Sequence, residues 1–453
     1  MYKGVGVMAE NVENINKDEK NNDLLYRASY DELTGVLNKR TFYLKAKEMM
    51  INNPDKQFQL LRMNVARFKV INELLGEAEG DKLLQYIGNF LRSVDLPLYE
   101  AGRLYSDHFV ICFSSDDDTV KHMMYSLRYI ASGFNLRHRT TLNFGLYRID
   151  DIELPVSIMC DRANIALVQA KADFYNPYRE YDDEMRRKMV LEQKILNVLD
   201  RALDEKEFIV YLQPKYDSNG DVLIGAEALV RWIHKEIDIE GEVISKFISP
   251  GDFVPVFEKN GLIYDLDKYV WRETCRLMRE WLRAGLDVKP ISVNVSRVDL
   301  YDPGLVDFFV DLIRCYEIPI ELLELELTES AYTQDPIQIL EVTDKLKDAG
   351  FTILMDDFGS GYSSLNMLKD VRVDTLKLDM GFLRSTDRSS RGGNILKAVV
   401  GMAKGLNLHV IAEGVETREQ VDFLSSIGCH RIQGYFYSKP LTADEYRELL
   451  KKK

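Results

Sequence analysis

Residues 351–359 read Phe-Thr-Ile-Leu-Met-Asp-Asp-Phe-Gly, so an apolar run stops on two adjacent carboxylates just before a glycine. A short apolar run of this kind predicts a buried β-strand that presents Asp356 and Asp357 at the edge of a sheet. Two like charges about 4 Å apart repel each other by roughly 4 kcal/mol at an effective dielectric constant near 20. In a recessed site the pair therefore needs a bound cation or a shared proton.

Adjacent residues of a strand point to opposite faces, so we expect the strand to end at Asp356 if both carboxylates are to reach one site. Gly359 and Gly361 follow in the sequence and permit the turn that this requires. The alternative, that a strand-end aspartate caps a helix or forms a turn, accounts for one carboxylate but not for the pair.

Other apolar runs in the second half of the chain stop on acidic, amide or basic side chains in the same way. These residues are Glu227, Asn294, Glu326, Lys377, Glu413 and Gln433. One such residue is usually structural, but a series of them at successive strand ends predicts a ring of oxygen ligands for a hard divalent cation. Glu324 shares a face with Glu326 one layer deeper, where it could be only a buried, hydrogen-bonded group.

The same apolar runs predict the fold of the second half of the chain. Eight candidate strands alternate with helical patterns, which indicates a (β/α)8 barrel, a TIM-like α/β fold of about 250 residues. In such barrels the active site lies at the C-terminal ends of the strands, where the polar residues are expected too. The candidate strands are Phe208–Leu212, Ala226–Val230, Ile291–Val295, Leu323–Leu327, Thr352–Met355, Thr375–Leu378, His409–Ala412 and Arg431–Gln433.

The first half of the chain predicts an α+β domain with a mainly antiparallel sheet. Its expected helices lie near 38–52, 79–93, 119–132 and 157–172, and its expected strands are Phe58–Val65, His108–Phe113 and Thr140–Tyr147. We therefore divide the chain into an N-terminal tail at 1–23, the α+β domain at 24–178, and a linker helix with the barrel domain at 179–453. The linker is charged and carries apolar residues at helical spacing from Met185 to Leu203.

Composition excludes some classes of function. Acidic residues outnumber basic ones by 73 to 59, a net charge of −14, which argues against non-specific binding to nucleic acids. A small anionic substrate stays compatible because a bound metal reverses the local field. We expect no membrane segment and no signal peptide, and five cysteines without a CxxC pair suit a cytoplasmic location.

Between about Met189 and Leu450 the chain resembles the EAL domain, a bacterial cyclic di-GMP phosphodiesterase. So many motifs in the right order exclude a chance match. One departure is a longer segment at 235–247, over which substrate approach is expected to differ. The motifs are Tyr211-Leu-Gln-Pro214, Glu227-Ala-Leu229, Ser292-Val-Asn294, Glu326-Leu-Thr-Glu329, Asp356-Asp-Phe-Gly-Ser-Gly361, Lys377-Leu-Asp379, Glu413-Gly-Val-Glu416 and Gln433-Gly434.

The resemblance implies a hydrolase that opens cyclic di-GMP to linear pGpG. It implies two Mg²⁺ or Mn²⁺ ions per active site, about 3.5–4 Å apart, which activate water and neutralise the phosphoryl oxygens. The implied ligands are Glu227, Asn294, Glu326, Asp356 and Asp357, and Asp356 bridges the two ions. Such oxygen ligands, one of them a neutral amide, suit these ions better than Zn²⁺.

The resemblance also implies roles for residues around the metal. Lys377 would orient the attacking water; its structural interpretation is a rim lysine paired with Asp379, and the two roles are compatible. Glu413 would be the general base or a ligand of the second ion, two roles that the sequence does not separate. Substrate contacts are implied for Gln213, Arg231, Asp379 and Gln433, and support of the ligands for Glu329 and Glu416.

The first domain resembles a degenerate GGDEF domain, the fold that makes cyclic di-GMP from two GTP. Its motifs Asp31-Glu-Leu-Thr-Gly-Val-Leu-Asn-Lys-Arg40, Phe68-Lys-Val-Ile-Asn72 and Gly80-Asp81 match, and Asn72 and Asp81 are the implied guanine contacts. The signature itself reads Tyr105-Ser-Asp-His-Phe109, and Asn64 stands at the position of a metal-binding aspartate. Because side chains replace the two glycines that approach phosphate, the resemblance implies that cyclase activity is lost.

Alternatives remain open for both domains. The barrel could be a receptor for cyclic di-GMP that signals through a protein partner, although such receptors usually lack several of the residues present here. The first domain could bind GTP or a related nucleotide through Asn72 and Asp81 and regulate the barrel. It could also be a scaffold, which we favour because the phosphate-binding glycines are missing. The family leads us to expect a homodimer.

Overall fold

The computed structural model describes residues 26–452 except 115–116, 135–139, 172–177, 238–242, 330, 335, 360–367, 369 and 380–390. The tail expected at 1–23 lies outside the described residues. The chain divides into two compact units, Met1–Leu191 and Glu192–Lys453. Within the described part, no helix has the length and apolar character needed to cross a membrane.

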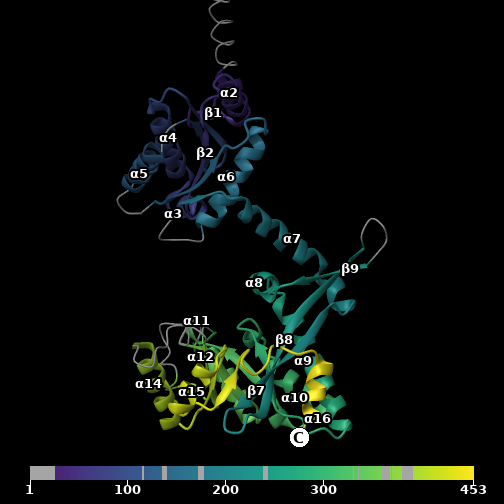
Figure 1. The fold of residues 1–453 in the computed structure, drawn as a ribbon. Coiled ribbons are helices and arrows are strands. Elements are labelled where there is room, and N and C mark those ends of the chain that lie inside the picture. The colour runs from purple at the N-terminus through teal and green to yellow at the C-terminus, as the bar shows by residue number, and fades with distance from the viewer. Residues whose placement is uncertain are drawn as a thin grey trace, which may run out of the picture. The chain divides into compact units, whose positions relative to one another are not determined.

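The first unit contains the predicted, mainly antiparallel sheet (Figure 1). Its strand order is β1-β3-β4-β2-β5-β6; the central strands pair antiparallel, and only the edge strands β1 and β6 pair parallel. The strands are β1 (Leu37–Asn38), β2 (Gln59–Val65), β3 (Tyr99–Tyr105), β4 (His108–Phe113), β5 (Leu142–Arg148) and β6 (Tyr178–Glu180).

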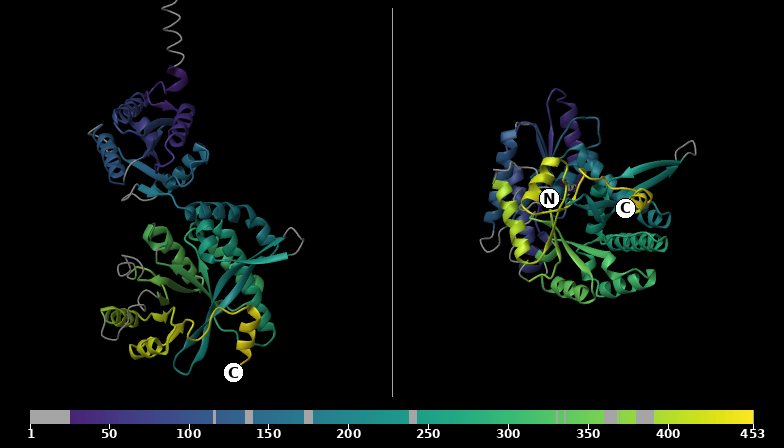
Figure 2. Two further views of the ribbon diagram at one scale, coloured as in Figure 1. Left: turned by 45° about the horizontal axis from the view of Figure 1, so that its top comes forward. Right: turned by 60° about the horizontal axis from the view of Figure 1, so that its bottom comes forward.

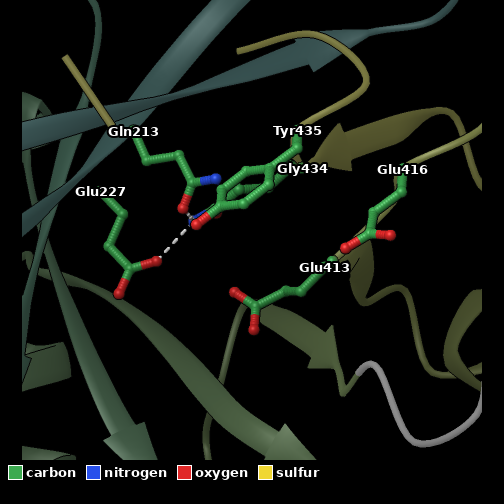
Figure 3. Close-up of a pocket in the computed structure, with 8 residues that line it drawn as sticks. Gln213, Glu227, Glu413, Glu416, Gly434 and Tyr435 are labelled. Carbon is green, nitrogen blue, oxygen red and sulfur yellow. Dashed lines mark hydrogen bonds between the residues drawn. The ribbon is translucent and has the colours of Figure 1, made fainter. Parts of the chain in front are cut away.

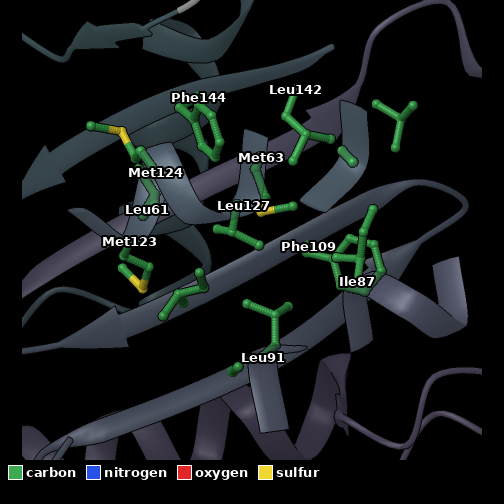
Figure 4. Packing of buried hydrophobic residues seen from close by; sticks show 14 of the residues in the cluster. Leu61, Met63, Ile87, Leu91, Phe109, Met123, Met124, Leu127, Leu142 and Phe144 are labelled. Atoms are coloured by element: carbon green, nitrogen blue, oxygen red, sulfur yellow. The ribbon is translucent and has the colours of Figure 1, made fainter. Parts of the chain in front are cut away.

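Helices cover both faces of this sheet because successive strand residues alternate between them. On β2, Leu61 and Met63 pack in one hydrophobic cluster with Ile87 and Leu127 (Figure 4), whereas Leu60 joins a second cluster. The four predicted helices are present, but the sequence did not predict α3 or the strands β1, β3 and β6. The helices are α2 (Lys39–Ile51), α3 (Phe68–Leu75), α4 (Glu77–Ser93), α5 (Asp117–Gly133) and α6 (Val156–Lys171).

The second unit is built on a closed eight-stranded barrel, which confirms the predicted fold. Pairing runs β10-β11-β12-β13-β14-β15-β7-β8, and β8 pairs with β10 to close the ring, while β9 pairs only with β8. All eight predicted strands are present. The strands are β7 (Phe208–Asp217), β8 (Val222–Ile237), β9 (Val243–Ile248), β10 (Ile291–Val295), β11 (Leu323–Thr328), β12 (Thr352–Phe358), β13 (Thr375–Leu378), β14 (His409–Ala412) and β15 (Arg431–Gln433).

Helices lie outside the strands of the barrel (Figure 2). The predicted linker helix is α7 (Asp183–Asp204), whose residues Ile195 and Leu199 are buried. Helix α9 presents a buried face that includes Trp271, Met278 and Trp281. The remaining helices are α8 (Pro250–Asn260), α9 (Ile263–Arg283), α10 (Leu305–Tyr316), α11 (Ala331–Gln334), α12 (Pro336–Asp348), α14 (Arg391–Gly405), α15 (Arg418–Ser426) and α16 (Ala443–Lys451), with the 3₁₀ turns η1 (Asp299–Tyr301) and η2 (Ile320–Leu322).

The barrel departs from the expected alternation at its first strand. No helix separates β7 from β8: the two form an antiparallel hairpin, and β7 also pairs antiparallel with β15. The seven other barrel strands pair parallel to one another. Because β7 runs the other way, it enters the barrel at the rim where its neighbours end. This direction places Gln213 opposite Glu227 and Lys215 opposite Gly225.

The long segment expected at 235–247 is largely a hairpin. Strand β8 continues to Ile237 and pairs with β9, from Trp232 opposite Ile248 to Ile237 opposite Val243. The hairpin projects from the barrel in Figure 1. At its base the buried Glu207 carboxylate accepts hydrogen bonds from Trp232 Nε1 at 2.9 Å and from the Lys235 amide at 3.1 Å. It also lies 2.8 Å from His234 Nδ1, so the turn before β7 is fixed to β8.

Gly225 offers a test of how the barrel closes. A Cβ atom there would lie 2.8 Å from the Pro290 carbonyl oxygen, at the seam where β8 meets β10. We expect Gly225→Ala to lower the free energy of unfolding by about 1–3 kcal/mol because the backbone must shift. All three tryptophans, Trp232, Trp271 and Trp281, lie in the barrel unit, so tryptophan fluorescence during guanidinium denaturation follows this unit alone.

The matched control is Gly401→Ala in α14, where a new Cβ meets no atom within 4 Å. Removing a helical glycine should leave stability unchanged or raise it by up to about 1 kcal/mol. Equal effects of the two substitutions would contradict the close approach at the seam.

Candidate active site

Parallel pairing brings the predicted acidic residues to the mouth of the barrel. Ser292 lies opposite Glu227, Asn294 opposite Glu326, and Thr328 opposite Asp356, so each side chain leaves its strand near the others. Carboxylate oxygens of Glu227, Glu326 and Asp356 lie within 4.8 Å of one another. Asn294 Nδ2 donates to Glu227 Oε1 at 3.1 Å. The first four predicted ligands therefore share one small volume.

Lys377 lies at the centre of this group. Its Nζ is 3.3 Å from Glu227 Oε2, 3.1 Å from Asp356 Oδ1 and 2.7 Å from Glu413 Oε1, and it donates to Glu326 Oε2. The side chain is completely buried. Lys377 therefore lies inside the barrel and not at its rim, where it pairs with these four carboxylates.

The electrostatics show that negative charge is in excess. Burial raises the pKa of Glu227 and of Asp356, and it raises the pKa of Glu413 to about 8. Burial also opposes ionisation of Glu326, but Lys215 and Lys377 together lower its pKa to about 2. Burial lowers the pKa of Lys377, and the four carboxylates more than reverse this, so the net shift is well upward. A low-dielectric site with too few ammonium groups favours a bound cation.

The Asp356–Asp357 pair is shaped by a bulge rather than by the end of the strand. The prediction that β12 ends at Asp356 is wrong: the strand continues to Phe358, and its register with β13 shifts between Met355 and Phe358. Asp357 has φ = 56°, a left-handed conformation that costs a residue other than glycine some energy. The bulge lets consecutive carboxylates avoid opposite faces, and Asp357 is the more exposed of the two.

A pocket of about 410 Å³ opens beside the buried carboxylates (Figure 3). In Figure 3 the side chains of Glu227 and Glu413 extend into the same space, and the ring of Tyr435 lies nearby. The lining residues are Gln213, Glu227, Glu413, Gly414, Glu416, Gln433, Gly434 and Tyr435. The acidic group is therefore accessible to a ligand from one side.

Gln433 and Gln213 support Glu227. Gln433 Nε2 donates to Glu227 Oε2 at 2.6 Å and to Gln213 Oε1 at 3.2 Å. Arg231 lies farther along β8, partly buried, with its guanidinium 5.7 Å from the centre of the Tyr211 ring. The three predicted substrate contacts Gln213, Arg231 and Gln433 therefore lie on the neighbouring strands β7, β8 and β15.

The other predicted residues lie around this centre. Glu329 is buried just after β11, and its Oε2 accepts from the Gly359 amide at 2.9 Å, as expected for a brace of the ligand loop. The rest of that loop, 360–367, lies outside the described residues. Glu416 is exposed at the pocket wall. Asp379 follows β13, and after burial its charge is the largest cause of the raised pKa of Asp357, which places the two near each other.

Sequence reasoning missed three residues of the site. Lys215 and Ser292 are buried beneath the carboxylates, and Tyr435 lines the pocket. Lys215 lies beyond the predicted strand Phe208–Leu212, and only the continuation of β7 to Asp217 places it two residues after Gln213 on the same face. Glu324 lies one layer deeper as expected, 3.7 Å from Lys215 Nζ.

The donor set fits a hard divalent cation. The converging atoms are carboxylate oxygens with one amide beside them, and neither histidine nor cysteine belongs to the described group. Oxygen donors are those that Mg²⁺ and Mn²⁺ prefer. A divalent ion would also compensate the part of the buried negative charge that Lys377 does not neutralise.

In the first unit the altered signature makes its own hydrogen bonds. Asp107 is buried, and its Oδ2 accepts from the Val65 amide at 3.0 Å and from Asn64 Nδ2 at 3.1 Å. Arg62 Nη2 donates to the Tyr105 hydroxyl at 2.8 Å. The hairpin is thereby tied to β2 by N–H donors, and one of them, Asn64, stands where the resemblance implies a metal-binding aspartate.

The predicted guanine contacts lie on two consecutive helices. Asn72 is on α3, and Asp81 is an exposed residue of α4. A Cβ atom on Gly80 would lie 1.9 Å from Asn72 Oδ1, so this glycine allows the two helices to approach. Within the described chain, the buried Asn72 Oδ1 has no hydrogen-bond partner.

Comparison with known proteins yields two domain matches. Residues 196–440 match the EAL domain, and residues 28–176 match the family described as diguanylate cyclase, GGDEF domain. These ranges contain the barrel and the first sheet, respectively.

Two curated proteins from Pseudomonas aeruginosa are similar along most of the chain. The bifunctional diguanylate cyclase/cyclic di-GMP phosphodiesterase MucR is 31% identical over 434 residues, which cover 94% of this chain and 62% of that protein. The cyclic di-GMP phosphodiesterase NbdA is 29% identical over 448 residues, which cover 96% of this chain and 55% of that protein. The chain thus spans little more than half the length of these relatives.

Solved structures resemble the barrel unit. The PaMucR phosphodiesterase in complex with c-di-GMP is 36% identical, with a TM-score of 0.51, covering 56% of this chain and 99% of that chain. The cAMP-bound EAL enzyme Bd1971 is 20% identical, with a TM-score of 0.52, covering 76% of this chain and 81% of that chain. The second likeness shows a shared fold.

Removing the central ammonium tests the charge balance of the site. We expect Lys377→Met to lower the free energy of unfolding of the barrel by about 3–5 kcal/mol at pH 8 in EDTA, because buried carboxylates lose their partner. Carboxylates whose pKa is raised by folding bind protons more readily in the folded state than in the unfolded state. The free-energy cost of burying them therefore falls as the pH falls. The loss of unfolding free energy in Lys377→Met should therefore become smaller as the pH falls from 8 to 5.

Guanidinium denaturation followed by tryptophan fluorescence measures both variants. Lys259→Met is the control, because Lys259 is exposed and pairs with Glu192 at 3.4 Å, a contact worth at most about 1 kcal/mol. A deficit for Lys377→Met that is small, or that does not change with pH, would contradict the charge balance described here.

Proposed function

Because the chain belongs to the family of proteins that join a GGDEF domain to an EAL domain, we propose that its barrel hydrolyses cyclic di-GMP to linear pGpG. The observation that carries the proposal is the convergence of Glu227, Asn294, Glu326, Asp356 and Lys377 beside one pocket. Similarity to proteins named as phosphodiesterases supports it.

The proposed cofactors are two Mg²⁺ or Mn²⁺ ions per active site. Glu227, Asn294, Glu326 and Asp356 would hold the first, and Asp356 and Asp357 would share in holding the second. When bound, such ions supply positive charge to the phosphoryl oxygens and lower the pKa of a bound water. The bulge at Asp356–Asp357 supports this assignment, because it keeps two neighbouring carboxylates on one side of the strand.

The residues of the chain would then position and deprotonate the nucleophile. Lys377, held between carboxylates, can donate a hydrogen bond to the attacking oxygen and keep it in place. Glu413 lines the pocket 2.7 Å from Lys377 and lies outside the group of three carboxylates, which favours it as the general base over a ligand. Its ion pair with Lys377 would keep the base beside the residue that positions the nucleophile.

Substrate contacts are proposed both on the walls of the pocket and on the barrel strands beside it. The fork of Arg231 suits a phosphate, and its position over Tyr211 restricts its orientation. Gln213 and Gln433 line the pocket while they brace Glu227, so a bound substrate and a metal ligand would share these amides. Asp379 is proposed as a further contact at the same rim.

The activity is tested by incubating the full chain with cyclic di-GMP and Mg²⁺ or Mn²⁺ and separating the products. We expect linear pGpG, complete loss of product in EDTA, and a loss of at least about 100-fold in kcat for Glu326→Gln. Glu324→Gln is the matched control, since it makes the same change two residues away on β11 and should keep most activity. Calcium should not replace the proposed ions, because its bonds are longer and its geometry is looser.

The alternative of a receptor without activity gives a different result in the same experiment. Tight binding of cyclic di-GMP with no pGpG in either metal would exclude the proposed hydrolysis and leave the receptor. Equal activity of Glu326→Gln and wild type would exclude the proposed ligand set.

For the first domain we propose that it does not synthesise cyclic di-GMP. Asp107 is already bonded to Asn64 and to the Val65 amide, and Tyr105 occupies the place of a phosphate-binding glycine. Nucleotide binding without catalysis stays compatible with the sequence, because Asn72 and Asp81 stand at the implied base-binding positions. A regulatory nucleotide site and a scaffold are thus the two roles to separate.

This proposal is tested in the Glu326→Gln background, where any cyclic di-GMP formed would not be degraded. We expect no cyclic di-GMP from GTP with Mg²⁺ or Mn²⁺, and any such product would contradict the assignment. Calorimetric titration with GTP decides between the two roles, with Asn72→Ala as the control. Heat that disappears in Asn72→Ala would establish the base site, and no heat with an unchanged hydrolysis rate would leave the scaffold.

A further inference from the structure

A second buried lysine lies on the floor of the barrel, below the proposed ligands. Lys215 comes from β7 and is 2% exposed. Its Nζ lies 2.6 Å from Ser292 Oγ, 3.0 Å from Glu326 Oε1 and 3.7 Å from Glu324 Oε2. A fully buried ammonium needs such partners, because an unpaired charge would cost several kcal/mol. None of the roles described so far uses this side chain.

The contacts fix the orientation of one carboxylate. Glu326 is completely buried, and its two oxygens face different ammonium groups, Lys215 at Oε1 and Lys377 at Oε2. Lys377 also contacts three other carboxylates, so its position is shared among them. Lys215 contacts only one of these four carboxylates, and Glu326 at 3.0 Å is nearer to it than Glu324 at 3.7 Å. This contact defines which oxygen of Glu326 faces the interior of the barrel.

The surroundings of Lys215 hold it in that position. Ser292 Oγ donates to the Ala226 carbonyl at 3.3 Å, which leaves its lone pairs to accept from Lys215 at 2.6 Å. Gly225 lies opposite Lys215 on β8, and even a Cβ there would be 3.8 Å from Lys215 Cδ. The lysine stem therefore passes beside a residue without a side chain on its way to the barrel axis.

We propose that Lys215 is a positioning residue that holds Glu326 Oε1 from below and so directs the other oxygen of Glu326 toward the proposed cation. The inference rests on the proposed function, because it assigns Lys215 to the same metal site. Lys215 does not line the pocket, so it acts through Glu326 and not on the substrate. Partners of metal ligands typically change metal affinity by 10- to 100-fold when they are removed.

The test is calorimetric titration of the full chain with Mn²⁺ alone, without substrate. We expect Lys215→Met to weaken Mn²⁺ binding by about 10- to 100-fold. Glu324→Gln, which removes only the 3.7 Å contact, should bind Mn²⁺ as the wild type does. With cyclic di-GMP as substrate, kcat of Lys215→Met should fall while KM stays within about twofold, because the pocket wall is unchanged.

A merely structural lysine would lower the unfolding midpoint and leave the Mn²⁺ affinity of the folded protein unchanged, which would overturn the inference. If Lys215→Met does not fold, Ser292→Ala takes its place: it removes the closest partner of Lys215, and we expect Mn²⁺ binding several-fold weaker. Unchanged binding in Ser292→Ala would then overturn it. Failure of the wild type to bind Mn²⁺ would instead refute the proposed metal site itself.

Discussion

The buried ion group around Lys377 is the constraint on which the rest of the barrel depends. Four carboxylates from β8, β11, β12 and the end of β14 surround one fully buried ammonium. Removing such charges from water costs several kcal/mol per ion unless partners compensate. The folded chain accepts this cost because closed strand pairing fixes the groups before any ligand binds. An active site preorganised in this way needs little rearrangement during a reaction.

Two local irregularities adapt a regular barrel to this task. The bulge in β12 brings Asp356 and Asp357 to one side of a strand that would otherwise separate them. The reversed strand β7 supplies no carboxylate to the ion group, but its side chains support the carboxylates of other strands. Lys215 contacts Glu326 directly, and Gln213 accepts a hydrogen bond from the Gln433 amide that also donates to Glu227. Both features place side chains, and neither follows from the barrel fold alone.

The sequence predicted the barrel strands well because these strands are buried on both faces and read as apolar runs. Four of them, β10, β13, β14 and β15, have the predicted limits. Strand β3 was missed because its sequence, Tyr-Glu-Ala-Gly-Arg-Leu-Tyr, is half-buried and contains a glycine and two charges. The direction of β7 depends on pairing with β15, more than 200 residues away, which no local pattern encodes.

The same limit applies to the site. Residues at strand ends were found because carboxylates there are unusual, whereas Lys215 was missed because it lies three residues beyond Leu212, the predicted end of its strand. Its burial depends on three strands that meet only in the closed barrel: β7, β10 and β11. Likewise, the bulge at Asp357 results from pairing between strands. The conformational preference of the residue alone disfavours the positive φ that Asp357 adopts.

The reversed strand also has a mechanical consequence. Helix α7 leads through a short turn into β7 at the very rim that carries the ion group, and Glu207 ties this turn to Trp232, His234 and the Lys235 amide. A displacement of α7 would therefore reach the barrel through this turn, which is held to β8 by the Glu207 carboxylate and by the hydrogen bond from the Ile233 amide to the Glu207 carbonyl. Beyond the turn, β7 leads to Lys215, which contacts Glu326.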